Sequence, residues 1–165
     1  MIRLHIVVEG HAEEGFVKRV LQPELAAKGV YADARRILTG SHRGAKHKGG
    51  LRNYEKLRND VELWMKEDRR RESWFTTIVD FHGLPPNFPG LEACRRRALP
   101  IERVKCLESA MFNDIESRLK PVVGETRLVP HLRLHEFESL LFAGTDKFLL
   151  QFPSATQVPS QLQEI

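Results

Sequence analysis

Residues 4–10 have the sequence LHIVVEG, an apolar run that ends in a carboxylate and a glycine. The succession of Ile and Val predicts a buried strand over residues 3–9. Glu9 is poorly placed there for stability, because a charge beside an apolar core costs several kcal/mol unless it is paired or bound to a metal. A carboxylate at the end of a buried strand therefore indicates a functional site.

Two further apolar runs are also followed by acids. Asp80 ends the run TIV at residues 77–79, and Glu136 and Glu138 follow the leucines of a later run. We therefore expect carboxylates from several strands to converge at one edge of a sheet. Hard divalent cations bind at such oxygen clusters, and phosphoryl chemistry can proceed there.

Strand-like and helix-like segments alternate along the chain, which predicts an α/β fold with a mostly parallel central sheet of about four strands and helices on both faces. Functional groups gather at the carboxyl ends of such strands. The pattern predicts strands at 3–9, 30–38, 74–80 and 128–134, and helices at 12–28, 51–70, 100–120 and 136–142. Pro23 is expected to kink or divide the first helix.

Composition indicates a soluble globular chain of one domain: 165 residues, 41% hydrophobic and 29% charged. We expect the α/β domain to span residues 1–150, with a tail or the start of another helix at 151–165. No stretch approaches the roughly 20 apolar residues of a membrane span. The net charge of +4 is compatible with a nucleic-acid partner. Cys94 and Cys106 show no metal-binding spacing and are expected to be reduced thiols in a cytoplasmic protein.

The residues after Glu9 offer a second candidate acid. Gly10 is expected to let the backbone turn tightly, and Glu13 then lies one helical turn further on. Glu13 is either a second functional carboxylate or, like Glu14, an acid that favours the helix N-terminus.

The basic segment of the chain follows the second predicted strand. Residues 43–52 read RGAKHKGGLR, so glycines permit close backbone approach while Arg43, Lys46, Lys48 and Arg52 suit phosphates. The segment lacks the order of a P-loop. It is either a phosphate-binding loop or a solvated one, whereas the arginines at 69–71 and 95–97 are expected to be solvated because acids lie beside them.

Four pieces of the chain, taken in order, resemble the Toprim domain of primases, topoisomerases and OLD-type nucleases, and more specifically a bacterial family of Toprim-like proteins without an assigned function. The pieces are VEG at 8–10 with Glu13, KGGL at 48–51, VDFHGLP at 79–85 with FPG at 88–90, and LHEFESLLF at 134–142. The resemblance implies a Toprim-like Rossmannoid fold that binds Mg²⁺ or Mn²⁺ and makes or breaks phosphodiester bonds.

The resemblance also implies roles for particular residues. Glu9 and Glu13 would hold an ion or position water, and Asp80 would be a central metal ligand. Glu136 or Glu138 would complete the metal site. The alternative is that neither binds a metal, and that one is an acid at the start of a helix and the other a solvated acid.

One departure concerns the position two residues after Asp80. A Toprim nuclease usually has a second Asp there, and this chain has His82. His82 marks a metal site retuned toward Mn²⁺, a general acid or base, or a site that has lost its chemistry. The sequence does not support a zinc protease, because the HExxH pattern starting at His135 would need a histidine where Ser139 stands.

Three functions follow as expectations. The first is a metal-dependent nuclease or related phosphoryl-transfer enzyme, for which the resemblance implies a role in bacterial defence or DNA processing with a separate ABC-type ATPase. The second is a non-catalytic module with a degenerate metal site that binds nucleic acid or protein. The third is a protein that binds a small phosphorylated ligand.

Overall fold

The computed structural model describes residues 1–37 and 51–135, and the compact unit discussed below ends at Leu134. Its elements, in chain order, are β1 (Ile2–Val8), α1 (His11–Phe16), the π-helical turn η1 (Val17–Leu21), α2 (Gln22–Ala26), β2 (Val30–Arg36), α3 (Tyr54–Glu67), β3 (Ser73–Asp80), α4 (Leu91–Arg95), α5 (Pro100–Val123), β4 (Leu128–Val129) and β5 (Leu132–Arg133). No helix in these two ranges has both the length and the apolar character of a membrane span. The domain boundary expected at residue 150 lies outside them.

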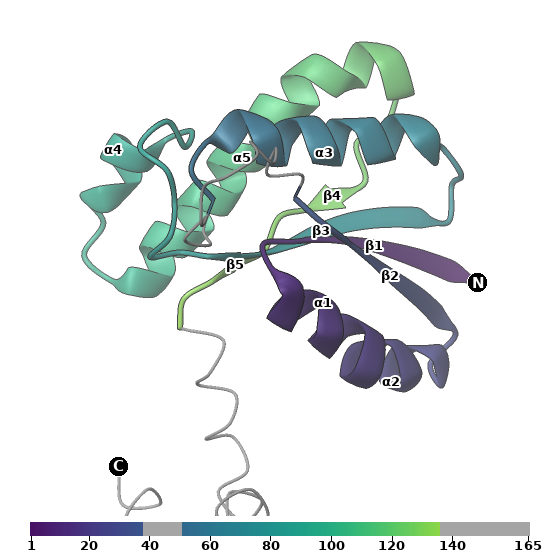
Figure 1. The fold of residues 1–165 in the computed structure, drawn as a ribbon. Helices are drawn as coiled ribbons and strands as arrows, with labels where there is room; N and C mark the ends of the chain where they lie inside the picture. Colours follow the sequence, from purple (N-terminus) through teal and green to yellow (C-terminus); the bar gives the residue numbers. More distant parts are fainter. Residues whose placement is uncertain (38–50, 136–165) are drawn as a thin grey trace, which may run out of the picture. The chain divides into compact units, whose positions relative to one another are not determined.

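The sheet has the order β2-β1-β3-β4, with β5 also paired to β3, and every pairing is parallel. Helices α1 and α2 lie on one side of the sheet, and α3 and α5 lie on the other (Figure 1). The predicted α/β fold with a mostly parallel sheet is therefore confirmed.

The fourth predicted strand is divided into β4 and β5 at Pro130, which has no N–H to donate to the sheet. The hydroxyl of Thr77 spans the gap: it donates to the carbonyl of His131 at 2.9 Å and accepts from the His131 N–H at 3.0 Å. The register against β3 is the same on both sides of the break, because Phe75 faces Leu128 and Asp80 faces Arg133. The interruption therefore preserves the alignment of the strand ends.

The first predicted helix, over residues 12–28, is divided into α1, η1 and α2. Pro23 is the second residue of α2, and only Gln22 separates it from the π-helical turn. The expected division of this helix at its proline is thus present, in the form of a π-helical turn.

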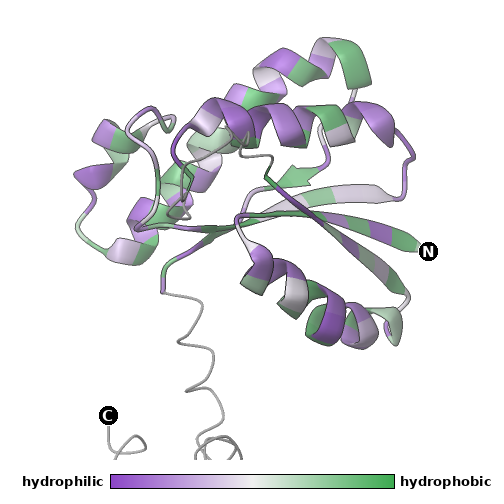
Figure 2. Ribbon diagram, in the orientation of Figure 1, coloured by the Kyte–Doolittle hydropathy of each residue, from purple (hydrophilic) through white to green (hydrophobic). Residues whose placement is uncertain are grey.

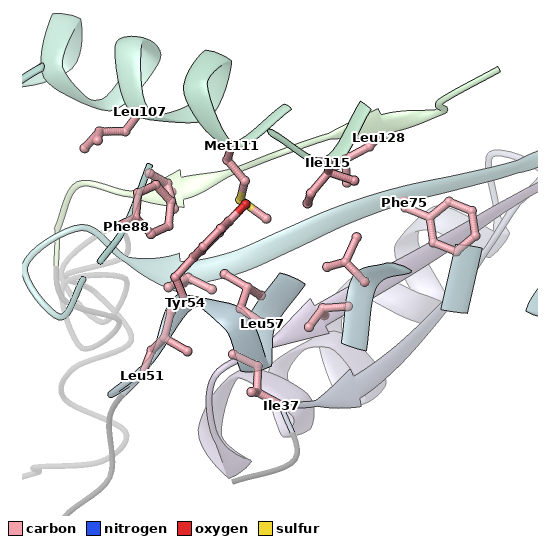
Figure 3. Close-up of a cluster of buried hydrophobic side chains, with 14 of the residues drawn as sticks. Ile37, Leu51, Tyr54, Leu57, Phe75, Phe88, Leu107, Met111, Ile115 and Leu128 are labelled. Atoms are coloured by element: carbon pink, nitrogen blue, oxygen red, sulfur yellow. The ribbon is translucent and has the colours of Figure 1, made fainter. Parts of the chain in front are cut away.

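Two hydrophobic clusters pack against the two faces of the sheet. Successive residues of β1 point to opposite faces, so that Ile6 and Val8 join the smaller cluster with Val17, while Val7 joins the larger one. Figure 3 shows the larger cluster, which includes Leu57 from α3. In Figure 2, hydrophilic residues alternate with hydrophobic ones along the outer helices, as amphipathic packing on a sheet requires.

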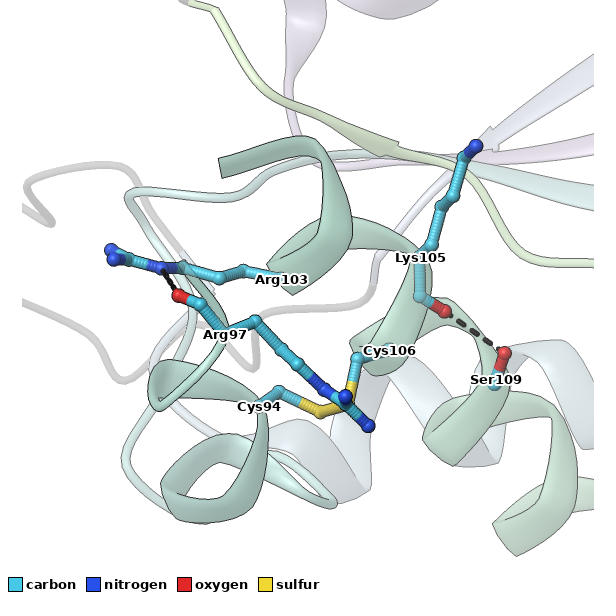
Figure 4. The surroundings of a disulfide bond; sticks show 6 residues. All are labelled: Cys94, Arg97, Arg103, Lys105, Cys106 and Ser109. Atoms are coloured by element: carbon cyan, nitrogen blue, oxygen red, sulfur yellow. Dashed lines mark hydrogen bonds between the residues drawn. A yellow bond between two sulfur atoms is a disulfide. The ribbon is translucent and has the colours of Figure 1, made fainter. Parts of the chain in front are cut away.

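Cys94 and Cys106 form a disulfide, with 5.6 Å between their Cα atoms, that joins α4 to α5 (Figure 4). The expectation of two reduced thiols is therefore wrong. Only 12 residues separate the two cysteines in sequence, and the turn between α4 and α5 brings them together. Gly90 precedes α4 with a φ of 72°, and a Cβ there would lie 2.8 Å from the Cβ of Ala110. Glycine thus permits α4 to approach α5 closely.

Asp68, beyond the C-terminal end of α3, contacts the buried His5 of β1. His5 Nε2 lies 2.9 Å from Asp68 Oδ2, and the Arg70 N–H donates to Asp68 Oδ1 at 3.2 Å. Burial alone would raise the pKa of Asp68, but the hydrogen bonds of its carboxylate outweigh burial and lower the pKa to about 2. The ionised carboxylate therefore stabilises the fold.

We expect Asp68→Asn to lower the free energy of unfolding at pH 7 by about 2 kcal/mol. The folded pKa is depressed, so this contribution is present above the unfolded pKa near 4 and is lost as the pH falls toward 2. Urea unfolding of both proteins between pH 7 and pH 2 measures it, with the exposed Glu72→Gln as control. A difference that stays constant across this range would contradict the assignment.

Candidate functional site

Glu9 lies at the carboxyl end of β1, where its carboxylate accepts two backbone hydrogen bonds. Oε1 accepts from the Leu51 N–H at 2.9 Å, and Oε2 accepts from the Asp80 N–H at 3.3 Å. β1 lies between β2 and β3, and the chain leaves β1 over one face of the sheet and reaches β3 over the other. Glu9 thus occupies the point where the direction of strand succession reverses, which is the usual ligand position in open α/β sheets.

Neighbouring acids, as well as burial, affect the pKa of Glu9. Burial is the main reason that the pKa of Glu9 is raised; the hydrogen bonds from Asp80 and Leu51 oppose the rise, and the charges of Asp80 and Glu13 add to it. Asp80 and Glu13 are therefore close enough to Glu9 for their charges to repel its carboxylate. Any cation that enters among them is favoured.

Arg133 pairs with two of these acids. Its Nη2 donates to Asp80 Oδ1 and, at 3.3 Å, to Glu13 Oε1. The side chains are 12% exposed for Arg133, 11% for Glu13 and 23% for Asp80, so the ion pairs are largely shielded from water. The site is thus a cluster of three acids and one arginine, called the carboxylate cluster below: Glu9, Glu13, Asp80 and Arg133.

The sequence reasoning missed Arg133, although a signal for it was present. Arg133 stands near the end of the fourth predicted strand as Asp80 stands at the end of the third. The parallel register places Arg133 directly beside Asp80. An arginine at the end of a buried strand indicates a functional site as an acid there does, because either charge is costly beside an apolar core unless it is paired.

Gly10 and Gly83 leave space for the cluster. A Cβ on Gly10 would lie 3.0 Å from Glu13 Oε2, and one on Gly83 would lie 3.8 Å from Glu9 Oε1. The backbone of Gly10 is extended, with a φ of −139°, which any residue adopts. The chain does bend at residues 9–10 between β1 and α1, but this conformation does not require a glycine; what the glycine adds is room for the Glu13 carboxylate.

His82 is exposed, and its ring packs edge-on against Phe81 with 5.1 Å between centroids. No contact between His82 and Glu9, Glu13 or Asp80 occurs in the described structure, so a direct role beside the carboxylates stays a prediction. Arg52 is exposed and follows Leu51, whose N–H binds Glu9. The other predicted site residues lie outside the described residues: Arg43, Lys46, Lys48, Glu136 and Glu138.

The carboxylate cluster offers the oxygen ligands that Mg²⁺ and Mn²⁺ prefer. Within residues 1–37 and 51–135, however, no three acids, histidines or cysteines are arranged to share a metal ion. Arg133 accounts for this in part, since its guanidinium group contacts both Glu13 and Asp80. The donor types fit a divalent cation, and the arginine competes with it for two of the acids.

Comparison with curated proteins finds no match, and neither does comparison with solved structures. A family model does match, over residues 8–165, which is nearly the whole chain and includes all of the carboxylate cluster. The chain belongs to the DUF4276 family, a domain of unknown function.

Proposed function

We propose that this chain is a divalent-metal-dependent enzyme that cleaves phosphodiester bonds or transfers phosphoryl groups, with the carboxylate cluster as its reaction centre. The observation that carries the proposal is the gathering of Glu9, Glu13 and Asp80 at the reversal point of a parallel sheet, with the pKa of Glu9 raised. The resemblance of VEG and VDFHG to Toprim sequences supports the same reaction class.

Asp80 and Glu9 would hold Mg²⁺ or Mn²⁺, with Glu13 beside them and Glu136 or Glu138 as further ligands. Bound there, the ion would neutralise phosphate charge and activate a water nucleophile. Glu9 keeps its orientation through its two backbone hydrogen bonds, so its carboxylate is preorganised. Arg133 would bind the substrate phosphate, which a guanidinium group can contact through two parallel N–H donors.

The nucleic-acid substrate and the separate ABC-type ATPase belong to this proposal through the Toprim resemblance. The basic residues Arg43, Lys46, Lys48 and Arg52 would contact the phosphate backbone. The net charge of +4 agrees with a polyanionic substrate.

The ion pairs of Arg133 favour a second candidate function. An arginine that satisfies Glu13 and Asp80 stabilises the cluster without a metal. In that case the chain is a binding module for nucleic acid or a protein partner and has no chemistry of its own.

Incubation with labelled single- and double-stranded DNA and RNA, in EDTA, Mg²⁺ or Mn²⁺, separates the two candidates. We expect cleavage only with metal, and a loss of at least about 100-fold in Glu9→Gln and in Asp80→Asn. Glu24→Gln, an exposed acid of α2, is the matched control. Cleavage that persists in EDTA or in both variants would overturn the enzyme proposal, and metal-independent binding without cleavage would establish the second candidate.

The pH dependence of cleavage gives an independent check. Ligation of a cation requires ionised Glu9, and because the pKa of Glu9 is raised in the metal-free chain, protons compete with the ion for this carboxylate. At subsaturating Mn²⁺, activity should therefore fall with decreasing pH at a higher pH than an ordinary glutamate would give, and more Mn²⁺ should move this acid limb to lower pH. In Glu9→Gln this acid limb should disappear from the residual activity.

A further inference from the structure

A cavity adjoins the carboxylate cluster across the turn that follows β3. The cavity has a volume of about 450 Å³, and its apolar wall includes Phe81, Leu84 and Leu107. This volume lies in the range of small-molecule sites, roughly 300–1,000 Å³.

The turn at residues 80–83 contributes residues both to the carboxylate cluster and to the lining of this cavity. It is closed by a hydrogen bond from the Gly83 N–H to the Asp80 carbonyl at 3.2 Å. Asp80 belongs to the carboxylate cluster, and Gly83 lies against Glu9. Phe81 and His82, between them in sequence, line the cavity. A ligand in the cavity would therefore lie one short turn away from the reaction centre.

Two arginines from different helices line the same cavity. Arg103 of α5 is oriented by hydrogen bonds from Nε to the Arg97 carbonyl at 2.8 Å and from Nη2 to the Ala98 carbonyl at 3.4 Å (Figure 4). Arg95 of α4 pairs with Glu92 at 3.2 Å, and both side chains are more than half exposed. Such an exposed pair is weak, so an anion can displace Glu92 from Arg95. The arginines at 95–97 are all exposed, as expected, and Arg95 also lines this cavity.

The disulfide holds together the two backbone segments that carry these arginines. Cys94 is adjacent to Arg95, and Cys106 lies one helical turn after Arg103, so the covalent bond joins the two segments that carry the cations. Because Phe81, His82 and leucines also line it, the cavity combines two guanidinium groups with aromatic and aliphatic surface. That is the combination that binds a phosphate and a base together: guanidinium groups contact phosphate oxygens, and bases stack on aromatic rings.

We infer that this cavity binds one nucleoside monophosphate unit, with its phosphate on Arg95 and Arg103 and its base against Phe81 and His82. The inference rests on the proposed function in one point: the bound nucleotide would be part of the substrate that is cleaved at the carboxylate cluster. The unit is either a free nucleotide or the terminal nucleotide of a strand, since both present the same groups.

Calorimetric titration of the whole chain in EDTA tests the inference without any cleavage. The probes are 2′-deoxyadenosine 5′-monophosphate, a 5′-phosphorylated hexanucleotide of single-stranded DNA, inorganic phosphate and the unphosphorylated nucleoside. We expect the mononucleotide to bind more tightly than phosphate or nucleoside alone. A hexanucleotide that binds at least as tightly as the mononucleotide identifies a strand end as the source, and a weaker hexanucleotide identifies a free nucleotide.

Arg95→Gln should weaken mononucleotide binding about tenfold, since a charge-assisted hydrogen bond is lost. Arg96→Gln removes the same charge from the next residue, which does not line the cavity, and should leave the affinity within about twofold. Glu92→Gln should tighten binding about twofold, a gain that misfolding cannot produce. Equal affinities in Arg95→Gln and Arg96→Gln, or no mononucleotide binding, would overturn the inference. Mononucleotide binding without cleavage under any metal would leave the cavity assigned and remove the enzyme proposal alone.

Discussion

Replacing Arg133 by glutamine is expected to lower the free energy of unfolding by about 3 kcal/mol in EDTA. The change removes the cation that pairs with both Glu13 and Asp80, whose side chains are 11% and 23% exposed. Breaking a buried ion pair by removal of one partner typically costs about 3–5 kcal/mol, and the partial exposure of Asp80 places this case at the low end. Urea unfolding with Arg118→Gln as control, an exposed arginine of a surface ion pair, measures the loss.

The same variant should bind divalent ions more tightly than the natural chain. Arg133 competes with a cation for Glu13 and Asp80, so its removal should shift the thermal midpoint in Mn²⁺ upward by more than in the natural chain. An ion present at 100 times its dissociation constant stabilises a folded protein by about 2.7 kcal/mol, enough to restore most of the loss. If Mn²⁺ stabilises neither protein, the acids are not a metal site and Arg133 is their permanent partner.

Reduction of the disulfide between Cys94 and Cys106 is expected to cost about 3 kcal/mol, or about 10 °C in the thermal midpoint. The bond closes a short loop, with a sequence separation of 12, and the loss of loop-closure entropy in the unfolded chain is worth roughly this amount. Thermal unfolding with and without a reductant measures it on one and the same chain.

A double variant, Cys94→Ala with Cys106→Ala, controls for other effects of the reductant. Its thermal midpoint should lie near that of the reduced natural chain and should not respond to the reductant. An oxidised and a reduced natural chain that unfold at the same temperature would show that α4 docks on α5 through its apolar residues alone.

The sequence carried enough information for the fold and for part of the site. Alternating apolar segments predicted the parallel sheet, and Glu9 and Asp80 stand at strand ends that can be recognised locally. The fourth strand was predicted as one segment over 128–134, and its division at Pro130 was not predicted, although a proline cannot complete a strand's hydrogen bonds.

What the sequence could not supply depends on register and on contacts between distant segments. Arg133 meets Asp80 because of a pairing across 53 residues, and the hydrogen bond from Leu51 to Glu9 spans 42. The disulfide was missed for the same reason: the spacing of two cysteines does not give the distance between their Cα atoms, which depends on how α4 docks against α5.

The position of β1 inside the sheet has a consequence for the order of folding events. Both edges of β1 are occupied, one by β2 at residues 30–36 and the other by β3 at residues 73–80. During synthesis β1 therefore lacks its second neighbour until β3 has emerged, since Arg3 pairs with Ser73, 70 residues later in the chain, and parallel pairing over such separations is slow. The apolar segment LHIVV thus stays incompletely paired over this interval, which makes it a segment that a chaperone would be expected to bind.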